Sequence, residues 1–183
     1  MTVAIIGAGP LGRRLALKSA QAGFRVMLED VMPASLRHAE EALRESLGPD
    51  TMPLVSFART VEEAVREADL AIDCVPDELE SKLEIFSLLD RMAPPRTIFA
   101  TPTTQLSIAD LASCTYRPGQ CVAIAVEPSQ LAPESFSATS PAQIPIRITR
   151  RTTPETRSLV SEFWQKLGYS PLIESDPAET QLQ

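Results

Sequence analysis

Residues that bind metals or form disulfides are scarce in this sequence. The 183 residues include one histidine, His38, and three cysteines, Cys74, Cys114 and Cys121. The cysteine spacing matches no zinc motif, so we expect no metal site. An odd number of irregularly spaced cysteines is typical of reduced thiols rather than of a disulfide framework. These features favour a cytoplasmic protein.

Long apolar runs and an excess of positive charge are also missing. No apolar run approaches the roughly 20 residues of a membrane-spanning helix, and the first apolar segment begins too early for a signal peptide to precede it. The 17 lysines and arginines are outnumbered by 24 aspartates and glutamates, which gives a net charge of −7. Because nucleic acids and anionic membranes require basic surface, we expect neither as a partner.

What the sequence does contain is a regular alternation of apolar strand patterns and helical patterns. We predict strands at 3–6, 24–28, 54–57, 70–75, 97–100, 122–126, 144–150 and 170–174. We predict helices at 11–21, 34–46, 61–67, 77–92, 108–113 and 155–167, the fourth with Leu79, Leu83, Phe86 and Leu89 on one face. This alternation predicts an α/β fold with a doubly wound, mostly parallel sheet of the Rossmann type.

The predicted sheet and its helices form one domain over residues 1–174. A proline-rich loop is expected at 127–143. Residues 175–183 have no apolar pattern, so we predict a flexible tail there.

A glycine-rich turn follows the first predicted strand, where residues 3–16 read VAIIGAGPLGRRLA. Gly7, Gly9 and Gly12 have the spacing that allows a tight turn, close approach of a pyrophosphate, and tight packing of helix on strand. An acidic residue, Asp30, ends the next strand, where a carboxylate binds the ribose hydroxyls and repels a 2′-phosphate. The sequence therefore predicts a site for NAD rather than NADP.

This turn has other interpretations. The glycines could pack tightly and bind nothing, and FAD uses the same fingerprint, although nothing else in the sequence indicates a flavin. Arg13 and Arg14 follow the third glycine, and we interpret them as solvated side chains with no assigned role.

The middle of the chain, residues 73–128, resembles the NAD-binding domain of the 3-hydroxyacyl-CoA dehydrogenases. The shared pattern is an acidic residue, a short apolar step, proline and an acid, and a lysine six residues after the proline; the chain reads DCVPDELESK. A strand, a hydroxyl-rich turn (TPTT), a short helix, an Arg-Pro pair and a further strand (VAIAVEP) follow. The resemblance extends from GAGPLG to TPETRSLVSEFWQKLGYSP, nearly the whole chain.

The resemblance implies roles for single residues. It assigns the three glycines and Asp30 to the cofactor, and it places Asp77 and Lys82 near the cofactor and the active-site cleft. Lys82 could equally pair with Glu78 on the exposed side of its helix. Thr104 matches a serine whose hydroxyl touches the substrate oxygen, although turn formation would also explain it.

The resemblance fails at the residues that carry proton transfer in the family. The position of the catalytic histidine falls on Ala125 or Val126, and the glutamate that orients it falls on Pro145 or Arg147. Pro102 replaces an asparagine. His38 is interpreted as a surface helix residue, and Glu127 is a weak alternative base that is better explained as an exposed loop acid.

The family's CoA-contacting arm and its helical C-terminal domain also have no counterpart in this sequence. Two functions follow from these observations. The first is an oxidoreductase for a small acyl-type substrate, in a homodimer or with a partner subunit that covers the missing wall of the cleft. The second is a non-catalytic NAD(H)-binding sensor or partner module. A third reading, in which the fold persists without nucleotide binding, is retained as an alternative.

Overall fold

The computed structural model of the protein describes residues 1–131 and 141–180. Most of the loop predicted at 127–143, and residues 181–183 of the predicted tail, lie outside this part of the chain. Within the described residues, no helix has the length and apolar character needed to cross a bilayer.

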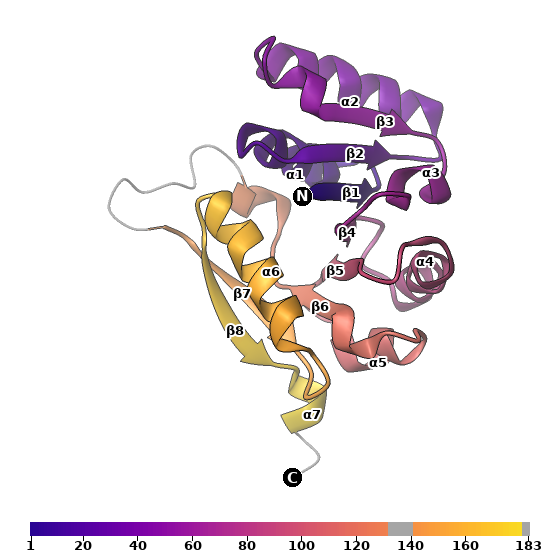
Figure 1. The fold of residues 1–183 in the computed structure, drawn as a ribbon, viewed down its shortest axis with the longest axis vertical. Coiled ribbons are helices and arrows are strands. Elements are labelled where there is room, and N and C mark those ends of the chain that lie inside the picture. Colours follow the sequence, from indigo (N-terminus) through magenta and orange to yellow (C-terminus); the bar gives the residue numbers. More distant parts are fainter. Residues whose placement is uncertain (132–140, 181–183) are drawn as a thin grey trace.

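An eight-stranded sheet runs through the centre of the domain (Figure 1). Its strands are β1 (Thr2–Ile6), β2 (Arg25–Glu29), β3 (Val55–Ala58), β4 (Leu70–Asp73), β5 (Ile98–Pro102), β6 (Cys121–Ile124), β7 (Gln143–Ile148) and β8 (Ser170–Ser175). The spatial order is β3-β2-β1-β4-β5-β6-β7-β8. Neighbouring strands are parallel except for β6 and β7, which run antiparallel. The predicted mostly parallel, doubly wound sheet is therefore confirmed.

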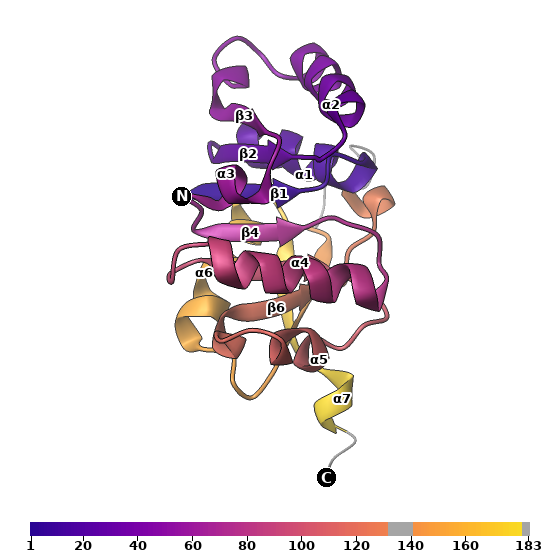
Figure 2. The ribbon, with the colours of Figure 1, turned by 90° about the vertical axis from the view of Figure 1, so that its right-hand side faces the viewer.

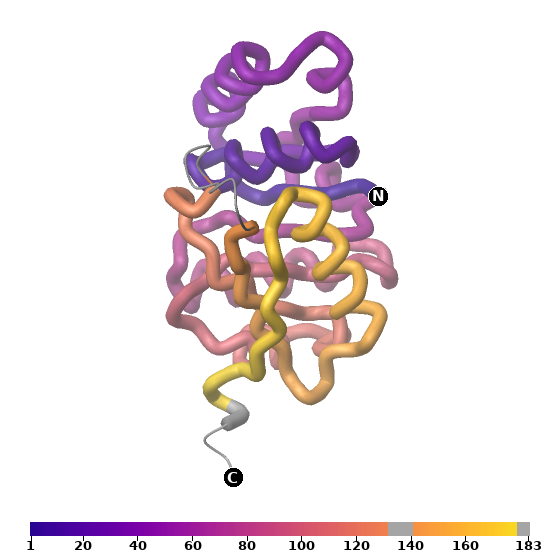
Figure 3. The backbone as a smooth tube through the Cα atoms, turned by 90° about the vertical axis from the view of Figure 1, so that its left-hand side faces the viewer, coloured from indigo at the N-terminus to yellow at the C-terminus, as the bar shows by residue number. Residues whose placement is uncertain are grey.

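Helices cover both faces of this sheet. One face carries α1 (Pro10–Gln21), α2 (Pro33–Ser46) and α6 (Pro154–Lys166), and Figure 3 views the molecule from that side. The other face carries α3 (Val61–Val65), α4 (Leu79–Met92) and α5 (Ile108–Ser113), which lie in front of the strands in Figure 2. Each face buries its own apolar core, because alternate residues of the strands point to opposite sides.

Short elements complete the chain: the 3-10 turns η1 (Met52–Leu54), η2 (Pro118–Gln120) and η3 (Pro128–Leu131), and the helix α7 (Pro177–Thr180). The junction between β8 and α7 is anchored. Asp176 is buried, and its carboxylate accepts hydrogen bonds from the Ser107 hydroxyl and the Ala109 N–H at the start of α5. The domain boundary at residue 174 and the flexible tail stay predictions.

The face predicted for the fourth helix is wrong at its first residue. Phe86 and Leu89 are fully buried, but Leu79 at the start of α4 is 45% exposed. Lys82, one turn further on, is fully buried instead. Lys82 is buried because it forms an ion pair with Asp73 on β4. The apolar periodicity of a helix cannot indicate a charged partner on another element.

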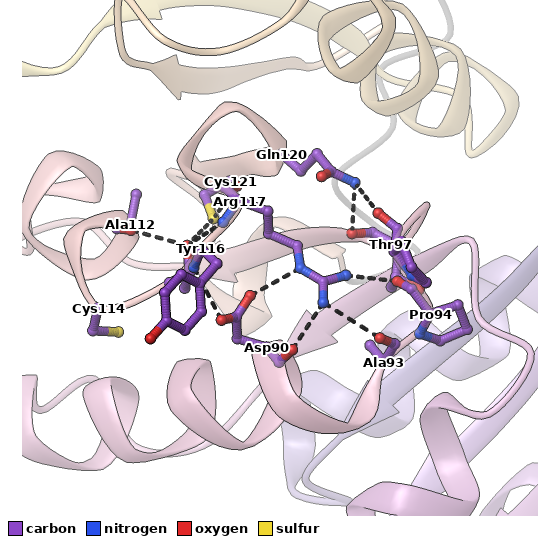
Figure 4. Close-up of polar contacts among 12 residues, drawn as sticks. Asp90, Ala93, Pro94, Thr97, Ala112, Cys114, Tyr116, Arg117, Gln120 and Cys121 are labelled. Atoms are coloured by element: carbon purple, nitrogen blue, oxygen red, sulfur yellow. Dashed lines mark hydrogen bonds and ion pairs between the residues drawn. The ribbon is translucent and has the colours of Figure 1, made fainter.

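Arg117 ties the carboxyl end of α4 to the segment that precedes β6 (Figure 4). Its guanidinium pairs with the Asp90 carboxylate at 2.9 Å, and it donates to the backbone carbonyl oxygens of Asp90, Ala93 and Pro94. It also lies 5.0 Å from the ring centroid of Phe99 on β5. The last carbonyls of a helix have no partner within the helix, so one arginine here satisfies several of them. This contact explains the Arg-Pro pair of the sequence pattern as a structural anchor.

Candidate functional site

The glycine turn lies where β1 passes into α1. Gly7 has φ +106°, a left-handed conformation that other residues adopt only with strain. Gly12 lies in the first turn of α1, and a Cβ atom placed there would lie 1.8 Å from the carbonyl oxygen of Gly7. These two glycines therefore allow the chain to turn back sharply and α1 to lie directly against the turn.

The space beside Gly9 is open. A Cβ atom on Gly9 would meet nothing within 4 Å, so the backbone there is accessible from outside. Gly9 is also the N-cap of α1, and Pro10 is the first helical residue. The N–H groups of a first helical turn have no partner within the helix, and the helix dipole adds positive charge at this end. The turn has the shape and the donors that a pyrophosphate requires.

Asp30 lies directly after β2, beside the glycine turn. Its carboxylate accepts hydrogen bonds from the N–H of Ala8 at 2.9 Å and from the N–H of Met32 at 2.8 Å. These hydrogen bonds fix the Asp30 carboxylate next to the glycine turn, where it stays partly exposed. The arrangement suits a ribose whose hydroxyls would donate to the carboxylate. The turn and Asp30 together fit the adenosine and pyrophosphate portions of NAD.

Glu29, directly before Asp30, is a buried acid that the sequence pattern does not single out. Glu29 is the last residue of β2, is only 5% exposed, and is paired in register with Ile6 of β1 and Ala58 of β3. Among the described residues, no group donates a hydrogen bond to its carboxylate. Burial, with a smaller contribution from the charge of Asp30, raises the pKa of Glu29 to about 7. The only sequence signal was an acid at a position that continues an apolar strand.

Glu29 makes the stability of the domain depend on pH. A carboxyl whose pKa is higher in the folded than in the unfolded protein favours folding below about pH 4.5, and this contribution is lost as the pH rises through about 7. We therefore expect Glu29→Gln to raise the free energy of unfolding by roughly 2 kcal/mol at pH 8 and by little at pH 4.5. Urea unfolding of both proteins at the two pH values measures this. Equal gains at both pH values would contradict the assignment.

A buried ion pair lies under the carboxyl end of β4. The Nζ of Lys82 lies 3.2 Å from Oδ2 of Asp73, and the two side chains are 1% and 0% exposed. The hydroxyl of Thr101 on β5 also donates to Asp73, and so does the N–H of Val75. Burial raises the pKa of the Asp73 carboxyl, and its three partners oppose that shift. The cluster joins β4, β5 and α4 at the edge where the cofactor crevice opens.

This cluster changes the interpretation of Lys82. The alternative pairing with Glu78 on an exposed helix side is wrong, because Lys82 points inward to Asp73. Its contact with the cofactor stays a prediction, and it would require the ammonium to move from its buried position. Asp77 lies exposed in the loop between β4 and α4, so it is accessible from the crevice side. The sequence pattern contained Asp73 but gave it no role.

Cys74 follows Asp73 at the same edge and is not a reactive group. Burial, with the charge of Asp73, raises the pKa of the Cys74 thiol well above its ordinary value. The thiol therefore stays protonated at neutral pH, and a protonated thiol is a poor nucleophile. The three cysteines are all free, as the sequence predicted. Among the described residues, no group of histidine, cysteine and acidic side chains could hold a metal ion.

The ends of β5 and β6 lie side by side at the same edge of the sheet. Pro102 is buried as the last residue of β5, and Thr104, two residues later, is exposed. Beyond β6, Ala125 is partly buried, Val126 is buried and Glu127 is exposed. Thr104 and Glu127 therefore both follow strands at the carboxyl edge of the sheet, and their roles stay predictions.

Ala125 and Pro145, each one of the two alternatives that the resemblance gives for the family's histidine and glutamate, are neighbours across strands β6 and β7. The N–H of Ala125 donates to the carbonyl of Pro145 at 3.0 Å, and Ala123 is paired in register with Arg147. Neither alanine nor proline has a side chain that can accept a proton. The chain's one histidine, His38, is exposed on α2, as expected for a surface helix residue.

Arg14 departs from the sequence interpretation. The sequence indicates a solvated side chain with no assigned role, whereas the Arg14 guanidinium donates a hydrogen bond to the backbone carbonyl of Pro128 in η3. This contact joins α1, which follows the glycine turn, to the segment that follows β6. The partner lies 114 residues away in the sequence, so no local pattern could have indicated it.

The fold and the crevice define a dinucleotide-binding domain of the Rossmann type. The strand order reverses between β1 and β4, and the glycine turn lies at the carboxyl end of β1, with Asp30 next to it after β2. Dinucleotide sites in such sheets lie at this reversal.

Comparison with known proteins gives the family. Residues 2–133 match the family described as 3-hydroxyacyl-CoA dehydrogenase, NAD binding domain. The chain belongs to this family, and the cofactor of the domain is NAD. A probable 3-hydroxybutyryl-CoA dehydrogenase of Bacillus subtilis is 32% identical over 133 residues, which cover 66% of this chain and 46% of that protein. The human lambda-crystallin homolog is 29% identical over 93% of this chain and 55% of its own length.

Solved structures agree with this assignment. The 3-hydroxyacyl-CoA dehydrogenase of Archaeoglobus fulgidus matches with a TM-score of 0.77 and 25% identity, over 99% of this chain and 58% of that one. A diketoreductase that acts on dicarbonyl compounds matches with a TM-score of 0.81 and 25% identity, over 95% and 64%. The chain thus spans about half to two thirds of the length of these relatives.

Proposed function

We propose that the chain binds NAD(H) in the crevice beside β1, β2 and β4, and that it does not supply the proton acceptor of its family. The observation that carries this proposal is that neither alternative for the histidine (Ala125 or Val126) nor either one for the glutamate (Pro145 or Arg147) has a side chain that can accept a proton. General-base catalysis contributes roughly 10²–10⁴-fold to a rate. Cofactor binding needs neither side chain, and the glycine turn and Asp30 that it does need are present.

An NAD(H)-binding sensor or partner module is therefore the function that we favour. A dehydrogenase acting on a small acyl-type substrate is the second candidate, because Thr104 presents an exposed hydroxyl at the edge of the crevice and Glu127 an exposed carboxylate. That activity would resemble the one named for the Bacillus subtilis relative, a probable 3-hydroxybutyryl-CoA dehydrogenase, and would place the protein in fatty acid metabolism. The three free thiols support a cytoplasmic location for either function.

A second copy of the chain or a partner subunit is part of the second candidate. Strand β8 forms an edge of the sheet, and its residues Leu172 and Ile173 are each 41% exposed. An apolar strand edge of this kind supports pairing with another chain. Such a partner would contribute the wall of the cleft.

The assay that separates the two functions is NADH oxidation with acetoacetyl-CoA, with NADH binding titrated in the same sample. We expect saturable NADH binding and a turnover at least about 100-fold below that of a 3-hydroxybutyryl-CoA dehydrogenase measured in parallel. Steady turnover at a comparable rate would contradict the non-catalytic function, and Glu127→Gln would then show whether Glu127 is the base.

A further inference from the structure

Arg147 reaches from β7 to the residues that follow β5, at the edge of the proposed crevice. It lies on β7, opposite Ala123 of β6, and its Nη1 donates to the carbonyl oxygen of Thr104 at 3.2 Å. Thr104 follows β5, and β6 lies between β5 and β7 in the sheet. The side chain of Arg147 must therefore cross β6 to make this contact. The residue opposite Arg147 on β6 is Ala123, whose small side chain leaves room for this path.

This path places the guanidinium over the carboxyl end of β6. Residues opposite one another in an antiparallel pair point to the same face, and so do residues two positions apart along a strand. Ala123, Ala125, Pro145 and Arg147 therefore share one face. Ala125, one of the two positions that the resemblance gives for the family's histidine, therefore lies on the same face as Arg147, two residues beyond the residue opposite it. Arg147 is itself one of the two positions that the resemblance gives for the glutamate, so a permanent cation could replace an acid there.

The guanidinium retains unused hydrogen-bond donors. Arginine has a planar fork of five N–H groups, and the contact with Thr104 uses one of them. In the described part of the chain, Arg147 forms no ion pair and no other hydrogen bond. Its contact with Thr104 is exposed to solvent, so the remaining donors are accessible to a ligand. Such a fork matches a carboxylate, which it binds through two parallel hydrogen bonds.

We propose that Arg147 binds the carboxylate of a small organic acid in the NAD(H)-loaded protein. The ligand class is a short-chain oxo or hydroxy acid, whose carboxylate accepts two parallel hydrogen bonds from the guanidinium. This inference rests on the proposed function, because the crevice is the one proposed for NAD(H). It concerns binding alone and requires no proton acceptor.

The test compares butyrate with butyramide, which have nearly the same shape but differ in charge. NADH reduces neither compound, so binding is measured without turnover. Each is titrated into the isotopically labelled, NADH-loaded protein, and amide chemical shifts report both affinity and location. We expect butyrate to bind at least tenfold more tightly than butyramide, with shifts at Thr104 and Ala125. Equal affinity for the two compounds in the wild-type protein, or shifts only elsewhere, would overturn the proposal without recourse to any variant.

Two variants assign the effect to one side chain. Arg147→Met should remove the preference for butyrate while leaving the affinity for NADH within about twofold, and Arg151→Met, at an exposed arginine of the turn after β7, should keep the preference. An unchanged preference in Arg147→Met would contradict the assignment. NADH binding is measured first. Absence of NADH binding would contradict the proposed function and not the role of Arg147. The preference for butyrate over butyramide would then be measured on the cofactor-free protein.

Discussion

Replacing Gly12 by alanine should abolish NADH binding and destabilise the domain by about 3 kcal/mol or more. The added Cβ atom would lie 1.8 Å from the carbonyl oxygen of Gly7, a backbone atom that cannot rotate away. Helix α1 would have to move off the turn, and the donors of its first turn would move with it. Urea unfolding measures the loss of stability, and the fluorescence of bound NADH measures the loss of affinity.

Two other glycines provide matched controls for this substitution. Gly9 and Gly48 both have open space where a Cβ atom would lie. Gly9→Ala should therefore leave stability nearly unchanged but weaken NADH binding at least tenfold, because the methyl group would occupy space next to the phosphates. Gly48→Ala, outside the crevice, should change neither property. Normal NADH binding by both Gly9→Ala and Gly12→Ala would contradict the location of the phosphate site.

The second large effect is expected at the buried ion pair. Lys82→Met should cost about 3–5 kcal/mol of stability at pH 8, because it leaves the Asp73 carboxylate buried without its cation. Burial already raises the pKa of Asp73, and removing the lysine raises it further. The variant should therefore recover part of its stability at low pH, where Asp73 takes up a proton. Urea unfolding at pH 5 and pH 8 measures both effects.

A double variant separates the charge from the loss of packing. Asp73→Asn combined with Lys82→Met removes both charges and keeps an amide that can bond with Thr101 and with the N–H of Val75. We expect the double variant to be more stable than Lys82→Met alone at pH 8. If the two are equally unstable, the methylene groups of Lys82 and not its charge hold the end of β4.

Much of the fold could be predicted because it depends on local patterns. The strands and the main helices begin and end close to their predicted positions, since apolar alternation, proline at helix starts and glycine at turns act over a few residues. The glycine turn was equally local. Asp30 could be assigned because it follows the strand after that turn at a characteristic spacing.

Contacts between distant segments cannot be predicted from such local patterns. Lys82 is buried because of Asp73 on another element, and Arg147 crosses a strand to reach Thr104, 43 residues away. Arg117 likewise meets partners more than 20 residues distant in the sequence. A helical or strand periodicity records which residues are apolar. It does not indicate which charged side chains form ion pairs or hydrogen bonds with distant residues in the folded domain.

The central claim is that this domain holds NAD(H) by its glycine turn and by Asp30. The most direct measurement is the affinity for NADH and NADPH, by fluorescence titration of the wild-type protein and of Asp30→Asn. We expect the wild-type protein to bind NADH at least tenfold more tightly than NADPH, and the variant to lose most of this preference, because the carboxylate would no longer repel the 2′-phosphate. Equal affinity of the wild-type protein for both cofactors, or binding of neither, would contradict the claim.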